Sequence, residues 1–157
     1  NLIFMKHFIN IKVVVISLVL TFISFNAKAQ NSYIKENKDL AATLSKEYGI
    51  PSSIILAVAF VESGGGTSKN SKALNNHFGI VGKNNVNSSK YKSFSSVKDS
   101  YRAFCELLSR KKYYSQLKGT DNHNAWVKAI ASAGYSTQPE TWKQRINSII
   151  TKFGLSD

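Results

Sequence analysis

Cysteine is almost absent from this sequence of 157 residues, because Cys105 stands alone. A disulfide framework within the chain is therefore excluded. Cys105 falls in the apolar stripe of a predicted helix, and no arrangement of histidine and asparagine accompanies it of the kind that activates a thiol nucleophile. We predict that Cys105 is a small core residue.

Histidine is nearly as scarce, with three residues in the chain. His7 falls in a predicted leader, and His77 and His123 lack partners at a spacing typical of metal ligands. We therefore expect neither a metal site nor another cofactor. His77 is expected to be a surface or packing residue.

Acidic residues are also few. Nine Asp and Glu stand against 21 Lys and Arg, which gives a net charge of +12 at pH 7. Lys6, Lys12 and Lys28 fall in the leader, so the mature chain keeps 18 basic against nine acidic residues, a net charge of +9. Such a charge suits a polyanionic partner. The lysines are scattered and no recognised nucleic-acid-binding motif occurs, so we expect no nucleic-acid partner.

One apolar run of the kind that directs export lies near the N-terminus. Met5, the expected start, opens a basic segment, and residues 13–25 are apolar and uncharged. Small residues then predict cleavage before Gln30, so that residues 1–29 form a signal peptide. A retained N-terminal anchor is the alternative. We expect an exported protein, periplasmic or secreted and associated with the cell wall, without stable membrane insertion after cleavage.

No repeat, low-complexity tract or internal linker interrupts residues 30–157, so this part is predicted to form a single domain. The hydrophobic periodicity indicates a mainly α fold. Both prolines of the chain, Pro51 and Pro139, stand at predicted helix starts. Helices are predicted at residues 31–48, 51–63, from 96 onward, 123–133 and 139–153.

The helical pattern breaks between residues 64 and 95, where glycine and asparagine accumulate. Two short apolar pieces, residues 77–81 and 91–94, could pair with each other. We expect a small irregular or β-hairpin lobe with little sheet.

The helix predicted at residues 51–63 is apolar nearly all round, which is typical of a central buried helix. Near its end it carries one carboxylate, Glu62, on a face shared with Ile55, Val58 and Ala59. Burial disfavours the charged form of a carboxyl group, so the pKa of Glu62 is expected to rise toward that of a general acid. A side chain turned to solvent at the helix end is the alternative.

Three segments in a fixed order resemble a known family: residues 61–64 (VESG), 75–80 (NNHFGI) and 133–137 (AGYST). Over roughly residues 33–154 the chain is similar to the glucosaminidase domain of bacterial cell-wall hydrolases, glycoside hydrolase family 73, which includes the flagellar peptidoglycan hydrolase. The resemblance implies a lysozyme-like fold and an endo-β-N-acetylglucosaminidase that hydrolyses β-1,4 bonds of peptidoglycan. The implied partner is the glycan strand, and we expect a monomer.

The resemblance also implies roles for individual residues. Glu62 matches the general acid of the family and Tyr135 its active-site tyrosine. Aromatic rings can pack on sugar faces and amides can bond their polar groups. The residues expected to bind substrate are Asn75, Asn76, Phe78, Gly79 and Tyr91.

Each of these assignments has a structural alternative. Asn75 and Asn76 could form turns, since asparagine is common there. Phe78 could fill the core at the base of the lobe. Tyr135 could be the apolar residue that follows a helix end.

The sequence departs from the family at two places. Gly65 stands where many relatives have an aromatic residue, so one wall of the groove can be missing. Residues 81–95 contain no Asp or Glu, where relatives with a longer hairpin carry a second acid. Asp99 is the candidate nearby, and its place in a capping box with Ser96 explains it without catalysis.

We therefore expect Glu62 to act without a carboxylate partner. The 2-acetamido group of the substrate, or a water placed by Tyr135, would then supply the second function. Two other functions fit the same residues: a lytic transglycosylase, which also uses a lysozyme-like fold and one glutamate, and a non-catalytic peptidoglycan-binding module.

Overall fold

The computed structural model describes residues 27–156. The chain divides into two compact units, residues 1–32 and 33–157. Most of the predicted signal peptide lies outside the described residues, and its cleavage site stays a prediction. Residues 27–32 are helical. Between residues 27 and 156, no helix is both long and apolar enough to cross a membrane.

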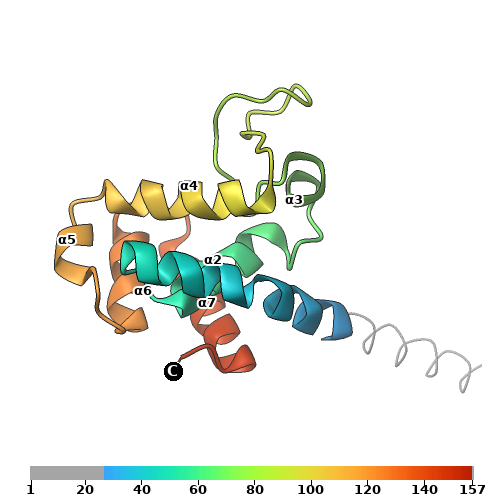
Figure 1. Ribbon diagram of the computed structural model, residues 1–157. Helices are drawn as coiled ribbons and strands as arrows, with labels where there is room; N and C mark the ends of the chain where they lie inside the picture. The colour runs from blue at the N-terminus through green and yellow to red at the C-terminus, as the bar shows by residue number, and fades with distance from the viewer. Residues whose placement is uncertain (1–26, 157) are drawn as a thin grey trace, which may run out of the picture. The chain divides into compact units, whose positions relative to one another are not determined.

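The second unit is mainly α. A first helix covers residues 33–48 of this unit, and the six helices that follow it in the described residues are labelled in Figure 1. All five predicted helices are present, whereas α3 and α5 occupy segments for which none was predicted. The six helices are α2 (Ser52–Ser63), α3 (Lys69–Leu74), α4 (Val97–Ser109), α5 (Tyr114–Leu117), α6 (His123–Ser132) and α7 (Pro139–Phe153).

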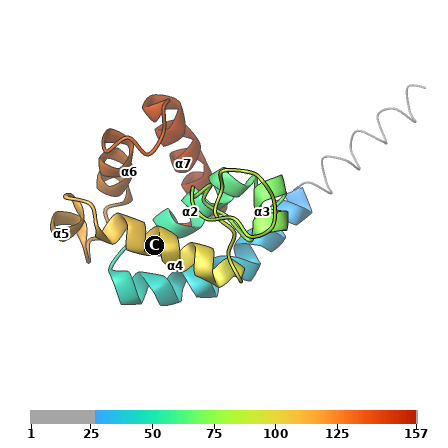
Figure 2. The ribbon, with the colours of Figure 1, turned by 90° about the horizontal axis from the view of Figure 1, so that it is seen from above.

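The core is built around α2. Nine of its twelve residues are buried, among them Ile54 and Ile55, and each such isoleucine contributes about 1.5–3 kcal/mol through burial. The helix contacts α4, α6 and α7, and Figure 2 shows it between α7 and α4. Gly64 ends it in the left-handed conformation, at φ 58°, which glycine adopts without strain. The end of α2 thereby delivers Glu62 to a fixed place.

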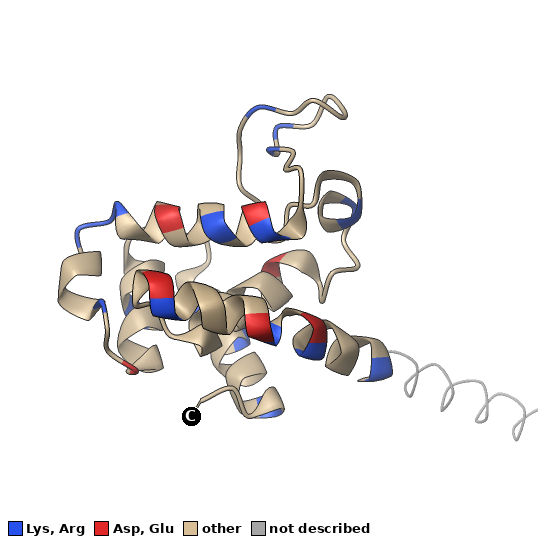
Figure 3. Ribbon diagram, viewed as in Figure 1, with Lys and Arg blue, Asp and Glu red and all other residues tan. Residues whose placement is uncertain are grey.

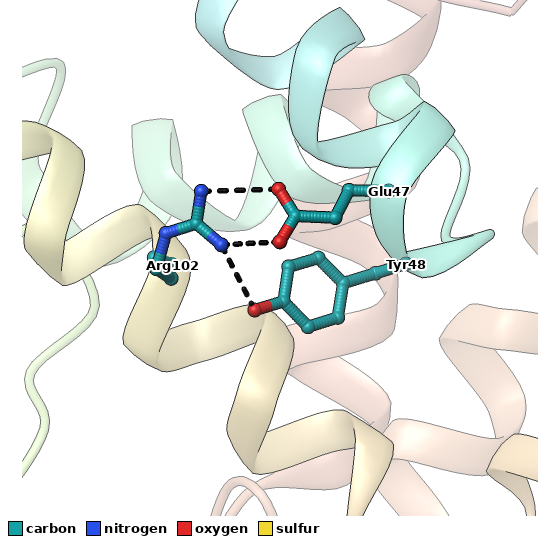
Figure 4. A network of polar contacts seen from close by, with 3 residues as sticks. All are labelled: Glu47, Tyr48 and Arg102. Atoms are coloured by element: carbon teal, nitrogen blue, oxygen red, sulfur yellow. Dashed lines mark hydrogen bonds and ion pairs between the residues drawn. The ribbon is translucent and has the colours of Figure 1, made fainter.

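A polar network fastens the first helix to α4 (Figure 4). The guanidinium of Arg102 donates to both carboxylate oxygens of Glu47 and to the hydroxyl of Tyr48. At the start of α4, the Ser96 hydroxyl accepts a hydrogen bond from the backbone N–H of Asp99 at 3.1 Å, which confirms the predicted cap. These contacts set the position of α4 above the core.

The lobe between α2 and α4 is mostly loop, and its last part rises beside the N-terminal end of α4 (Figure 1). The expected hairpin is reduced to one isolated antiparallel bridge, Val81 to Tyr91. Farther out, the Asn84 side chain accepts hydrogen bonds from the backbone N–H groups of Val86 and Asn87. These local bonds close the loop on itself, so a longer ladder does not form.

Candidate functional site

A cavity of about 390 Å³ opens beside the end of α2. The turn at residues 78–81, the segments around α4 and α5, and the end of α6 complete it. Four of the residues predicted for the site meet there: Glu62, Phe78, Gly79 and Tyr135. The remaining lining residues are Ile80, Val81, Leu107, Lys111, Tyr113, Ile130, Ala133 and Gly134.

Glu62 is half-buried in the last turn of α2. Burial raises the pKa of its carboxyl group, and the hydrogen bond from Trp142 and the charge of Arg145 oppose the rise in part. The indole Nε1 of Trp142 donates to Oε1 of Glu62 at 2.8 Å. The pKa of Glu62 is thus raised, which is the direction predicted from the apolar face that it shares. A helix C-terminus, which carries partial negative charge, adds to the same effect.

Tyr135 reaches the cavity from the loop between α6 and α7. Gly134, at φ 81°, lets the chain turn there. The Tyr135 ring lies 5.3 Å from that of Trp142, centroid to centroid. Burial raises the pKa of its hydroxyl well above the ordinary value, and the charge of Glu62 adds to it. The phenol is therefore neutral at pH 7 and can donate a hydrogen bond in the cavity.

Phe78 serves the core and the cavity together. Its side chain is 3% exposed, and its ring stacks on Phe104 with centroids 4.3 Å apart. Its backbone carbonyl faces the Tyr135 hydroxyl at 3.4 Å. Gly79 follows at φ 65°, and a Cβ there would lie 3.9 Å from the Tyr91 ring. The Phe78 ring therefore fills the core, which was the structural alternative for this residue. The backbone of the turn forms the cavity wall.

This combination of fold and cavity can be compared with known proteins. Residues 38–155 match the model of the glucosaminidase family, described as mannosyl-glycoprotein endo-beta-N-acetylglucosaminidase. The chain belongs to this family, the glucosaminidases of glycoside hydrolase family 73.

Relatives support the same assignment. The chain is 25% identical over 150 residues to the exo-glucosaminidase LytG of Bacillus subtilis (strain 168). The match covers 82% of this chain and 53% of LytG, so the chain spans about half the length of this curated relative.

Two solved structures share the fold. The catalytic domain of the autolysin Auto from Listeria monocytogenes has a TM-score of 0.71 at 23% identity, over 82% of this chain and 86% of that domain. The glycoside hydrolase domain of FlgJ from Salmonella typhimurium has a TM-score of 0.63 at 22% identity, over 80% and 88%. The predicted fold class is therefore confirmed at the level of the family.

The two asparagines of the glucosaminidase motif lie outside the residues that line the cavity. Asn76 is 1% exposed, and its amide nitrogen donates to the carbonyl oxygens of Ile80 at 2.8 Å and Lys92 at 2.9 Å. Its amide oxygen accepts from the backbone N–H groups of Phe78 and Ile80. Asn75 caps α3 at φ 52° and donates to the carbonyl oxygen of Phe94. Both contacts fit the turn-forming alternative.

Tyr91 and Asp99 also lie outside the cavity lining. Tyr91 is half-buried on the bridge to Val81, and Asp99 is exposed in the first turn of α4. Gly65 packs by its backbone near Phe60, where an added Cβ would lie 3.1 Å from the ring. Glu62 is the one carboxylate among the residues that line the cavity.

His77 is a packing residue, in line with the prediction. It is 6% exposed, and its Nδ1 lies 2.7 Å from the hydroxyl of Tyr33, which also contacts the Tyr101 hydroxyl at 2.9 Å. Burial lowers the pKa of His77, which keeps the ring neutral at pH 7. Across residues 27–156, no group of three or more His, Cys, Asp or Glu side chains could hold a metal ion.

Four residues at or near the cavity were not predicted as site residues: Lys111, Tyr113, Trp142 and Arg145. Trp142 falls within the helix predicted at residues 139–153. Its contact with Glu62 joins positions 80 residues apart, so no local pattern could indicate it.

Proposed function

We propose that this chain is a peptidoglycan hydrolase, an endo-β-N-acetylglucosaminidase that cleaves β-1,4 bonds following N-acetylglucosamine. The observation that carries the proposal is the position of Glu62, half-buried at the wall of a cavity in a glucosaminidase fold. Burial raises the pKa of its carboxyl group, as a general acid requires. Glu62 gives its proton to the glycosidic oxygen of the leaving sugar as the C1–O bond breaks.

The second catalytic group, which attacks C1 in place of a second carboxylate, is supplied by the substrate or by water. Because Glu62 is the one carboxylate among the lining residues, a second carboxylate is not invoked. The carbonyl oxygen of the 2-acetamido group attacks C1, and water later opens the cyclic intermediate, returning a proton to Glu62. The neutral Tyr135 hydroxyl, which belongs to a residue lining the same cavity, holds the acetamido group or the water by a hydrogen bond.

The rest of the cavity suits a sugar strand. Its volume of about 390 Å³ is within the range of small-molecule sites, about 300–1,000 Å³. Ile80, Val81 and Leu107 offer apolar surface, and Lys111 offers a cation to carboxylates of the strand. Gly79 keeps the wall open next to the Tyr91 ring. Asn75 and Asn76 contribute by shaping this turn.

Digestion of purified sacculi by residues 30–157 and by a Glu62→Gln variant tests the proposal. The wild type should release fragments with N-acetylglucosamine at the reducing end, and the variant should bind sacculi without lysing them. Mass spectrometry identifies the products. Anhydromuramic ends would assign the chain as a lytic transglycosylase, and unchanged lysis by the variant would remove Glu62 from the mechanism.

The stereochemistry of the product tests the second function separately. Participation of the acetamido group gives net retention at the anomeric carbon. NMR of a chitooligosaccharide or glycan digest, recorded before mutarotation, distinguishes the two anomers. Clear inversion would exclude acetamido participation and leave the water that Tyr135 places.

The substrate also sets where the protein acts. We propose that it is exported and works at the cell wall as a monomer, with its basic surface near anionic wall polymers.

A further inference from the structure

We infer that Trp142 is a positioning residue that decides which oxygen of Glu62 delivers the proton: the indole holds Oε1, so Oε2 carries the proton into the cavity. The inference deepens the proposed function and rests on it for the catalytic meaning of Glu62. It goes beyond that function because it assigns a role to a residue of α7 and separates the two carboxyl oxygens.

The geometry of the contact supports this role. Trp142 is 5% exposed, and its Nε1 lies 2.8 Å from Oε1 of Glu62. An indole N–H can donate but cannot accept a hydrogen bond. Oε1 therefore stays an acceptor in both protonation states of Glu62. The carbonyl oxygen of a protonated carboxyl group is a better acceptor than its hydroxyl oxygen, so the acid proton resides on Oε2, the oxygen that the Trp142 indole does not contact.

The position of the indole is itself constrained. Its ring lies against Tyr135, with centroids 5.3 Å apart, and α7 packs along α2. A buried aromatic ring held from two sides loses little further freedom when Glu62 orients against it. The carboxyl group is thus held in one orientation before substrate arrives, which lowers the entropic barrier to proton transfer.

Other charged and titratable groups surround Glu62, but they act differently. Arg145 comes from α7 and is exposed, Lys111 and Tyr113 line the cavity beyond α4, and Tyr135 precedes α7. The charges of exposed cations are screened by salt and have no fixed direction. The indole contact is directional and shielded in part from solvent, so it can select one oxygen.

NMR of the unmodified protein tests the inference. The chain has two tryptophans, so its spectrum has two side-chain indole N–H signals. The Trp142 signal should move with pH along the titration curve of the Glu62 carboxyl carbon. The Trp126 indole, which donates to the carbonyl oxygen of Thr120 at 3.3 Å, should not follow that curve. A Trp142 signal that is flat through the titration of Glu62 would overturn the inference.

Hydrogen exchange locates the proton. With Oε1 as a permanent acceptor, the Trp142 indole N–H should stay protected below the pKa of Glu62. Exchange that becomes fast when Glu62 is protonated would place the proton on Oε1 and overturn the assignment of Oε2.

A pair of matched variants adds an activity readout. Trp142→Phe and Trp126→Phe each remove one buried indole N–H and keep an aromatic ring. Only Trp142→Phe should raise the pKa of Glu62 and move the alkaline limb of the pH–activity profile upward, by about one pH unit. An unchanged Glu62 titration in Trp142→Phe contradicts the inference. Wild-type protein that lyses no sacculi but shows the linked titration would instead defeat the proposed function and keep the positioning role.

Discussion

The hydroxyl of Tyr135 faces the backbone carbonyl of Phe78 at 3.4 Å, although 57 positions separate the two residues. This relationship brings the loop after α6 against the turn that follows α3. Two of the three segments that resemble the family therefore meet across one cavity, and Glu62 of the third segment stands beside them. Segments that are far apart along the chain thus lie together at one cavity.

Replacing Tyr135 with Phe should lower kcat on peptidoglycan by about 10²-fold, because the hydroxyl that orients the acetamido group or water is lost. Stability should change little, since a contact of 3.4 Å is a weak hydrogen bond. Thermal unfolding and turnover of the same preparation check both parts.

Tyr114→Phe is the matched control for this change. The Tyr114 hydroxyl donates to the carbonyl oxygen of Tyr48 at 2.6 Å and is absent from the cavity lining. Its loss should cost about 1 kcal/mol of stability and leave kcat unchanged. If Tyr135→Phe lowers Tm more than Tyr114→Phe and keeps its turnover, Tyr135 has a packing role only.

Glu62→Gln should be more stable than the wild type at pH 7. A carboxyl group whose pKa is raised by folding stabilises the fold fully below its unfolded pKa, and this contribution is lost as pH rises through the folded pKa. The neutral amide avoids that loss. We expect a gain in Tm on the order of 3 °C at pH 7 that vanishes near pH 3.

Calorimetry at both pH values checks the sign. Exposed Glu106→Gln on α4, whose side chain faces away from the core, serves as the control and should show no such gain. A Glu62→Gln variant that is less stable at pH 7 than at pH 3, relative to wild type, would contradict the raised pKa.

The lobe should contribute to attachment to anionic wall polymers. Residues 64–95 contain five lysines and no acidic residue, and the ribbon of the outer loop in Figure 3 carries the blue of Lys and Arg but no red of Asp and Glu. Changing Lys83, Lys90 and Lys92 together to Gln should weaken sacculus binding about fivefold at low salt. The difference should shrink at high salt, because screening shortens the range of the charges.

The first helix provides an equal change of charge on a mixed surface. Lys35, Lys38 and Lys46 alternate there with acidic residues, so the same triple substitution to Gln should weaken binding less. A sedimentation assay with Glu62→Gln as the background separates binding from lysis. Equal losses in both triple variants would show that net charge alone matters.

Asn76→Ala should destabilise the domain by about 2–3 kcal/mol. The substitution strips partners from four backbone groups, and Asn76 is 1% exposed. Chemical denaturation measures the loss, and Asn85→Ala in the exposed loop is the control. A loss below about 0.5 kcal/mol would contradict this structural role and favour the prediction that Asn76 contacts substrate.

The helices and the acid were accessible from sequence because their signals are local. The helix predicted at residues 51–63 contains an unbroken apolar run at residues 54–61, and α2 begins and ends within one residue of the predicted range. The raised pKa of Glu62 followed from the apolar face that it shares. Ser96 and Asp99 formed the predicted cap since a capping box needs only four consecutive residues.

The features that could not be predicted from the sequence either depend on tertiary contacts or are helices too short to show a periodic pattern. The α3 and α5 helices have six and four residues, fewer than two helical turns, so no periodic pattern could develop. Asn76 matches the family motif, yet its amide forms hydrogen bonds within the lobe. Trp142 looked like any apolar residue of α7, since only packing of α7 on α2 brings its indole to Glu62.

The contact of Tyr33 with His77 indicates that the folded domain needs the chain from Tyr33 onward. Tyr33 is 6% exposed, and a Cβ on Gly66 would lie 2.8 Å from its ring, so the ring seals the glycine turn that follows α2. A protease that trims the chain past Tyr33 would let water reach the neutral imidazole of His77. Recombinant or fused versions therefore need Tyr33 intact, only three positions after the predicted cleavage at Gln30.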